Sequence, residues 1–102
     1  MIDIKPATGS NNSFFNNDFE TDEAHPLVRY SPIGLATVTD VFAHNDFESN
    51  KGASTANLFV ISGPLSGLTI RNNDFEDDDN FGNGISIQSN VTNLNIRDNK
   101  FD

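Results

Sequence analysis

The chain of 102 residues has no cysteine and no tryptophan, and only 6 lysine and arginine residues stand against 15 aspartate and glutamate residues. Without cysteine, neither a disulfide framework nor a thiolate metal site can form. The formal net charge of −9 disfavours binding to nucleic acid or to an anionic membrane, since both carry charge of the same sign. We therefore expect no nucleic-acid partner and no membrane partner.

Long apolar runs are also missing. No stretch approaches the roughly 20 apolar residues of a membrane-spanning helix, and the opening MIDIKPATGS lacks the basic region and apolar run of a signal peptide. Hydrophobic residues recur at a spacing of two, and never at the spacing of three and four that marks a helix. The pattern therefore predicts short strands throughout.

A twelve-residue segment, LSGLTIRNNDFE at 65–76, occurs in four variant copies that align without a gap. The copies end at Glu20, Glu48, Glu76 and Asp102, so the steps are 28, 28 and 26 residues. A period of this length predicts one supersecondary unit per repeat, stacked on its neighbours. We number the repeats 1 to 4 and expect residues 1–102 to form a single domain.

Three positions of the segment carry most of the pattern. The sixth residue is Phe or Ile, the ninth is always Asn and the eleventh is always Phe. Stacking predicts an asparagine column and a phenylalanine column, which are Asn17, Asn45, Asn73, Asn99 and Phe19, Phe47, Phe75, Phe101. Because Asn tolerates the left-handed backbone conformation, we expect the ninth residue to form the corner between two strands. Its amide can also pass hydrogen bonds from repeat to repeat.

Each repeat carries a second extended stretch, followed by a turn rich in Pro, Gly, Ser or Asn. These stretches are Met1–Lys5, Leu27–Tyr30, Asn57–Ile61 and Gly84–Gln88. Polar loops of varying length at 21–26, 48–56 and 77–83 then join one repeat to the next. Variable loops on one side of a regular stack are typical of a solenoid.

The pattern L-x-I-x-x-N-x-F, at 68–75 and again at 94–101, resembles the repeats of right-handed parallel β-helix proteins of the pectate-lyase-like superfamily. The resemblance implies an all-β, right-handed parallel β-helix, a solenoid of about four rungs. It also favours an extracellular, virion or cell-surface location. Polysaccharide lyases, mannuronan epimerases and phage tailspikes share this scaffold, so the resemblance leaves the activity open.

Two further columns are acidic. The tenth residues are three aspartates and then Lys100, and the twelfth are three glutamates and then Asp102. Carboxylates about 5 Å apart repel one another, so these columns either face solvent or hold cations. Calcium takes six to eight oxygen ligands, carboxylates included. The candidate calcium site is formed by Asp74, Glu76, Asp77, Asp78 and Asp79.

No P-loop, zinc, nucleophile-elbow or dinucleotide motif is present, and we assign no catalytic residue. His25 is expected in a surface loop and His44 in a polar turn. In the lyases of the resembling family an Arg or Lys abstracts a proton beside a calcium-bound uronate, a role that Arg71, Arg97 and Lys100 could imitate. The simpler interpretation pairs these cations with neighbouring acids on the surface.

Neither end of the repeat array carries an evident capping sequence, and uncapped strand edges invite pairing with another chain. The uncapped ends indicate either that the chain associates through its ends or that it is a fragment of a longer β-helix. Our favoured interpretation is a non-enzymatic scaffold or binding module of unknown ligand that forms homo-oligomers through its ends. The alternative is a carbohydrate-binding or polysaccharide-modifying fragment of the lyase or epimerase kind, with calcium as its cofactor and a polysaccharide as its partner. A third interpretation is an acidic calcium-binding domain without catalysis.

Overall fold

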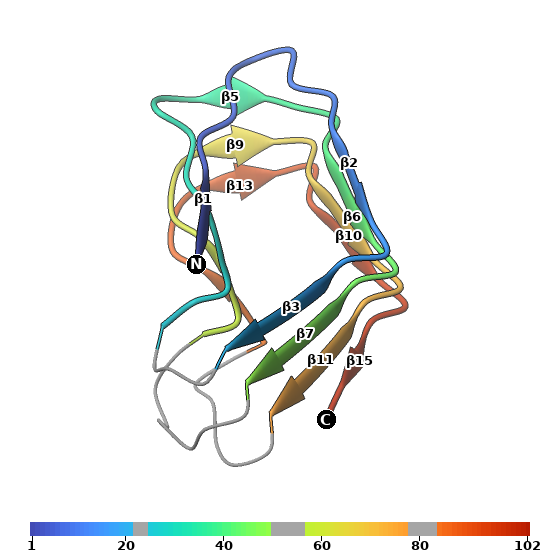
Figure 1. Ribbon diagram of the computed structural model, residues 1–102. Coiled ribbons are helices and arrows are strands. Elements are labelled where there is room, and N and C mark those ends of the chain that lie inside the picture. The colour runs from blue at the N-terminus through green and yellow to red at the C-terminus, as the bar shows by residue number, and fades with distance from the viewer. Residues whose placement is uncertain (22–24, 50–56, 78–83) are drawn as a thin grey trace.

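The structure, a computed structural model, describes residues 1–21, 25–49, 57–77 and 84–102. In these ranges the chain is all-β, with fifteen strands of two to four residues and no helix, and hence no helix that could cross a membrane. The strands form four sheets in which every strand pairing is parallel (Figure 1). The predicted all-β class is confirmed, and the arrangement is consistent with a β-helix-like solenoid.

The chain visits sheets 1, 2, 3 and 4 in this order in repeats 2 to 4, and repeat 1 follows the same order without a strand in sheet 2 (Figure 1). Sheet 1 contains β1 (Ile2–Ile4), β4 (Val28–Tyr30), β8 (Phe59–Ile61) and β12 (Ile85–Ile87). Sheet 2 contains β5 (Ala36–Thr37), β9 (Leu65–Ser66) and β13 (Val91–Thr92). Sheet 3 contains β2 (Ser13–Phe15), β6 (Val41–Ala43), β10 (Thr69–Arg71) and β14 (Asn95–Arg97). Sheet 4 contains β3 (Asp18–Thr21), β7 (Asp46–Ser49), β11 (Asp74–Asp77) and β15 (Lys100–Phe101).

The phenylalanine column runs through sheet 4 as predicted. Successive rings stack with centroid separations of 4.9, 4.7 and 5.0 Å, and their planes lie within 8° of parallel. Phe47 and Phe75, in the middle of the column, are fully buried, and burial of each stabilises the fold by about 1.5–3 kcal/mol. The sixth residues form a second column in sheet 3, where Phe14 stacks on Phe42 at 4.4 Å.

The asparagine column is also confirmed, and it is a continuous hydrogen-bonded ladder. In repeats 1 to 3, the backbone N–H and the side-chain Nδ2 of the Asn donate to Oδ1 of the Asn in the following repeat, at 2.9–3.0 Å. In repeats 2 to 4, Nδ2 also donates to a backbone carbonyl of the preceding repeat, as Asn73 does to Phe42 O at 3.0 Å. Asn45 and Asn73 are 3% and 2% exposed, so their polar atoms depend on these partners.

The corner between sheets 3 and 4 lies one residue earlier than predicted. The left-handed residues are the eighth of each copy, with φ between 54° and 56°: Asn16, His44, Asn72 and Asp98. The ninth residue is not left-handed in any copy. Its side chain points inward and bonds the ladder, so the prediction that the ninth Asn makes the corner was wrong. The prediction that His44 is a polar turn residue is confirmed.

The ungapped alignment of the four copies is wrong at its first positions. Strand β5 pairs with β9 at an offset of 29 residues, Thr37 lying opposite Ser66, whereas β6 pairs with β10 at an offset of 28, Val41 lying opposite Thr69. Repeat 2 therefore has one extra residue between these strands. Glycine accommodates it, because a Cβ at Gly67, where φ is +105°, would lie 2.0 Å from the carbonyl oxygen of Val38.

A pair of substitutions separates the ladder position from the corner position. Asn73→Gly removes the acceptor for two N–H groups of Asn45 and a donor to Phe42 O. We expect the free energy of unfolding to fall by about 2–4 kcal/mol, because buried polar atoms lose their partners. Asn72→Gly, at the exposed left-handed position, should change it by less than about 0.5 kcal/mol, since Gly adopts φ > 0 freely.

Urea denaturation of the two variants and the wild type measures both values. Tolerance of Asn73→Gly together with destabilisation by Asn72→Gly would reverse the two assignments.

Candidate functional site

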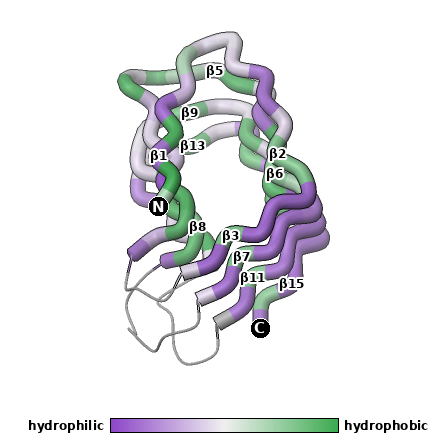
Figure 2. The backbone as a smooth tube through the Cα atoms, viewed as in Figure 1, coloured by the Kyte–Doolittle hydropathy of each residue, from purple (hydrophilic) through white to green (hydrophobic). Residues whose placement is uncertain are grey.

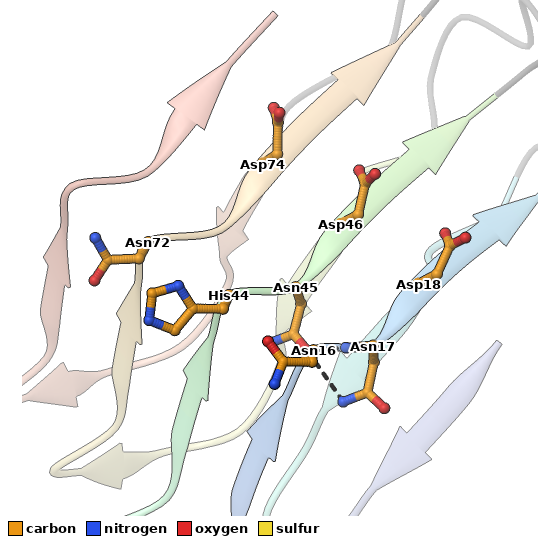
Figure 3. Close-up of a pocket in the computed structure, with 8 residues that line it drawn as sticks. All are labelled: Asn16, Asn17, Asp18, His44, Asn45, Asp46, Asn72 and Asp74. Atoms are coloured by element: carbon orange, nitrogen blue, oxygen red, sulfur yellow. Dashed lines mark hydrogen bonds between the residues drawn. The ribbon is translucent and has the colours of Figure 1, made fainter.

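The corner between sheets 3 and 4 is bordered by an open groove of about 450 Å³. Its lining comes from the eighth, ninth and tenth residues of repeats 1 to 3, namely Asn16, Asn17, Asp18, His44, Asn45, Asp46, Asn72 and Asp74. Figure 3 shows three aspartates side by side on β3, β7 and β11, with the left-handed residues in a parallel row beside them. The same corner forms a hydrophilic band on the backbone in Figure 2. All of the lining residues are polar, and three of them are acidic.

The aspartate row holds like charges in register. Asp46 lies directly between Asp18 and Asp74 in the parallel pairing of sheet 4. Partial burial and then the repulsion of Asp74 and of Asp18 raise the pKa of the Asp46 carboxyl, with Lys100 acting in the opposite direction. The parallel register of sheet 4 thus holds carboxylates of like charge next to one another, and their mutual repulsion disfavours the ionised form.

Lys100 ends the row with a charge of the opposite sign. Its Nζ lies 3.3 Å from Asp74 Oδ2 and also forms an ion pair with Asp102. The hydrogen bonds to Asp102 and to Asp74 raise the pKa of the Lys100 ammonium above its ordinary value. Because Lys100 and Asp102 are exposed, this pairing neutralises charge locally but contributes little to folding stability.

The predicted calcium site is placed only in part. Asp74 and Glu76 lie together with Asp102, and one ligand oxygen of each lies within 4.8 Å of the others. Asp74 Oδ1 is buried and accepts no hydrogen bond from the residues described. Asp78 and Asp79 lie outside the described residues, as does the side chain of Asp77. The structure thus adds Asp102 as a candidate ligand, and calcium binding stays a prediction.

The two histidines lie in different surroundings. His25, predicted at the surface, is half-buried, with Nδ1 2.9 Å from Pro26 O and Nε2 3.5 Å from Thr21 Oγ1. His44 is exposed at the corner of repeat 2. The Thr21–His25 separation is longer than the distance of about 2.6–3.2 Å that is typical of a nucleophile and its base.

The arginines of β10 and β14 lie on the outer face of sheet 3. Arg97 pairs with the adjacent acid Asp98 at 3.1 Å, as the simpler interpretation predicted. Arg71 contacts an amide instead, with Nη1 3.2 Å from Asn72 Oδ1. Its guanidinium carbon also lies 6.0 Å from the ring centre of Phe15, a weak cation–π contact that crosses Ala43.

A buried polar cluster around Asp40 was missed by the sequence analysis. The carboxylate is fully buried and accepts hydrogen bonds from the hydroxyl of Tyr30 and from the backbone N–H of Asn12 at 2.7 Å. The Ser10 hydroxyl lies 2.7 and 2.9 Å from its two oxygens. A signal was present, since Asp40 occupies the fourth position of the repeat, where repeat 3 has Leu68.

The Asp40 carboxylate accepts hydrogen bonds from three residues, Ser10, Asn12 and Tyr30. Burial, followed by the hydrogen bond and the charge of Asp40, raises the pKa of the Tyr30 hydroxyl, so it remains a donor through the neutral range. A buried carboxylate without hydrogen bonds would strongly destabilise the fold. Because the donors come from repeats 1 and 2, the cluster links these two repeats at the fourth position. Repeats 3 and 4 have Leu68 and Leu94 at that position.

No protein-family model, curated protein or solved structure matches this chain. The resemblance to the pectate-lyase-like superfamily therefore stays a prediction from the repeat pattern. Function has to be argued from the geometry of this chain, because a β-helical scaffold by itself is compatible with many activities.

Replacing Asp46 tests the repulsion in the aspartate row. Asp46→Asn should raise the free energy of unfolding at pH 7 by up to about 1 kcal/mol at low salt. The raised pKa means that the folded state binds this proton more tightly than the unfolded chain. The penalty of the ionised form is therefore absent well below pH 4 and grows as the pH rises through the folded pKa.

Urea denaturation at pH 7 and pH 3 checks both parts of this prediction. Asp18→Asn, which removes an acid with a single aspartate neighbour, should give a smaller gain. A loss of stability for Asp46→Asn at pH 7 would contradict the repulsion.

Proposed function

We propose that the chain is a non-enzymatic scaffold or binding module, built as a right-handed parallel β-helix of four rungs, that self-associates through its two end faces. The order of sheets 1 to 4 in repeats 2 to 4, and of sheets 1, 3 and 4 in repeat 1, supports the rungs. Right-handedness is the general preference of connections between parallel strands of one sheet. A surface or virion setting, where such scaffolds assemble, fits the proposal.

The observation that carries this proposal is the exposure of core columns at both ends of the stack. In sheet 1, Val28 and Phe59 are fully buried, whereas Ile2 in the same column is 47% exposed. At the other end, Ile87 is 49% and Phe101 is 52% exposed. These side chains belong to the interior columns, and no further repeat covers them among the described residues. Exposed apolar surface of this kind is typical of an interaction site.

The strand edges add to the same tendency. Every sheet ends in a strand whose outer backbone groups face no further strand among the described residues, as β3 and β15 do in sheet 4. Parallel sheets are normally covered, and open edges are sites of pairing with other chains. The two end faces therefore offer both apolar side chains and unpaired backbone groups to a partner.

A calcium-dependent polysaccharide-binding module is the second candidate. The favouring observation is Asp74 Oδ1, which is buried within a group of three carboxylates and accepts no hydrogen bond from the part of the chain that the structure describes. Arg71 and Phe15 on the outer face of sheet 3 could contact an acidic sugar by charge and by stacking. A polyuronate is the ligand that the resemblance to the pectate-lyase-like superfamily implies.

Sedimentation velocity over a wide concentration range tests the proposed self-association. We expect the weight-average sedimentation coefficient to rise with concentration, because burial of the exposed apolar columns drives association. Activity assays on polysaccharides should show no turnover. A single monomeric species at all concentrations, up to the solubility limit, would refute self-association.

Calcium titration tests the second candidate. If the cluster binds calcium, the melting temperature should rise with added calcium and return on addition of EDTA, since a ligand that binds only the folded state stabilises it. Asp74→Asn should abolish the shift, whereas Asp18→Asn, at the equivalent position of repeat 1, should keep it. An unchanged melting temperature of the wild type at millimolar calcium would exclude the site.

A further inference from the structure

Resting on the proposed self-association, we propose that the partner is a second copy of this chain, stacked head to tail. Repeat 1 of one copy would lie on repeat 4 of the next, in the register that successive repeats already use within one chain. Three independent features of the two end faces fit each other in this register. They are the open ends of the asparagine ladder, the charges of the tenth residues and the core columns.

The asparagine ladder is open at both ends in complementary ways. Asn99 Nδ2 donates to Ile70 O, but its backbone N–H meets no acceptor among the described residues. At the other end, Asn17 donates to Asn45 Oδ1, and Oδ1 of Asn17 accepts no hydrogen bond from any described residue. Within the chain, an Asn N–H facing the Oδ1 of the following Asn is the repeating contact. Asn17 of the next copy would supply the acceptor that Asn99 lacks.

The charges of the end faces select the head-to-tail orientation. Lys100 is the tenth residue of repeat 4, and Asp18 is the tenth residue of repeat 1. Continuing the register of sheet 4 places Lys100 opposite Asp18 of the next copy, as it is already opposite Asp74 within the chain. Stacking repeat 4 on repeat 4 would oppose lysines, and stacking repeat 1 on repeat 1 would oppose aspartates.

The core columns match across the same junction. Sheet 1 would continue from Ile87 to Ile4 of the next copy, and sheet 4 from Phe101 to Phe19. One contact is unfavourable, because Asp102 would lie opposite Glu20. Acid opposite acid already occurs within the chain in the same column, where the structure keeps the glutamates of β7 and β11 in register.

A head-to-tail contact uses two different surfaces, and here each copy is shifted along the axis of the stack, so the contacts do not close into a ring. Each added copy presents a fresh end face, and the product is an open-ended array rather than a dimer. Continuing the strand spacing of about 4.8 Å across the junction would give a fibre with strands perpendicular to its axis. Growth by single copies therefore distinguishes this arrangement from any symmetric dimer.

Charge reversal at the junction tests the register. Asp18→Lys and Lys100→Asp, each alone, place like charges opposite each other and should weaken association about fivefold. An equimolar mixture of the two variants restores opposite charges at every mixed junction, so it should associate about as well as the wild type. Asp46→Lys makes the same charge change one repeat away from the end face and should leave association unchanged.

Sedimentation velocity at matched concentrations, with circular dichroism to verify folding, measures these effects. Restoration in the mixture also excludes the possibility that the single variants fail to associate because they are unfolded. If the wild type associates but neither variant differs from it, this register is overturned while the proposed self-association stands. If the wild type stays monomeric, both fall.

Discussion

The hydrogen bonds of the buried asparagine ladder set the register on which the rest of the structure depends. In repeats 1 to 3, the Asn donates from its backbone N–H and its side-chain amide to the Oδ1 of the next Asn, so adjacent repeats can meet only with ninth residue against ninth residue. A slip by one residue would turn every inward side chain outward and leave buried amides unpaired. Register in this chain is therefore enforced by polar groups, and the phenylalanine column follows from it.

The register places identical side chains of successive repeats next to one another, which stabilises the fold for apolar side chains and destabilises it for charged ones. For Phe47 and Phe75 it gives stacked rings and full burial. For Asp46 it adds the repulsion of two carboxylate neighbours to the effect of partial burial, and both raise the pKa of its carboxyl. Lys100 breaks the pattern at the last repeat and pairs with the acid beneath it. The row of aspartates is thus a consequence of the repeat. Its ion pair forms in repeat 4, where Lys100 replaces the aspartate.

The columns could be predicted from the sequence because each depends on one residue type at one position. The corner could not, since Asn fills both the eighth and ninth positions of repeats 1 and 3. His44 and Asp98 distinguish them, because a left-handed corner accepts several polar residues, whereas the ladder needs a donor and an acceptor on one short side chain. The cluster around Asp40 needs the positions of Tyr30 and Ser10, which no single repeat contains.

Amide hydrogen exchange, measured residue by residue by NMR, tests the register-setting role of the ladder most directly. The backbone N–H groups of Asn45 and Asn73 are buried and bonded to side-chain oxygens, so they should exchange only through global unfolding. Under conditions where the chain is monomeric, the N–H of Asn99 should exchange orders of magnitude faster. Rapid exchange at Asn45 and Asn73 in the folded protein would contradict the central role given to this ladder.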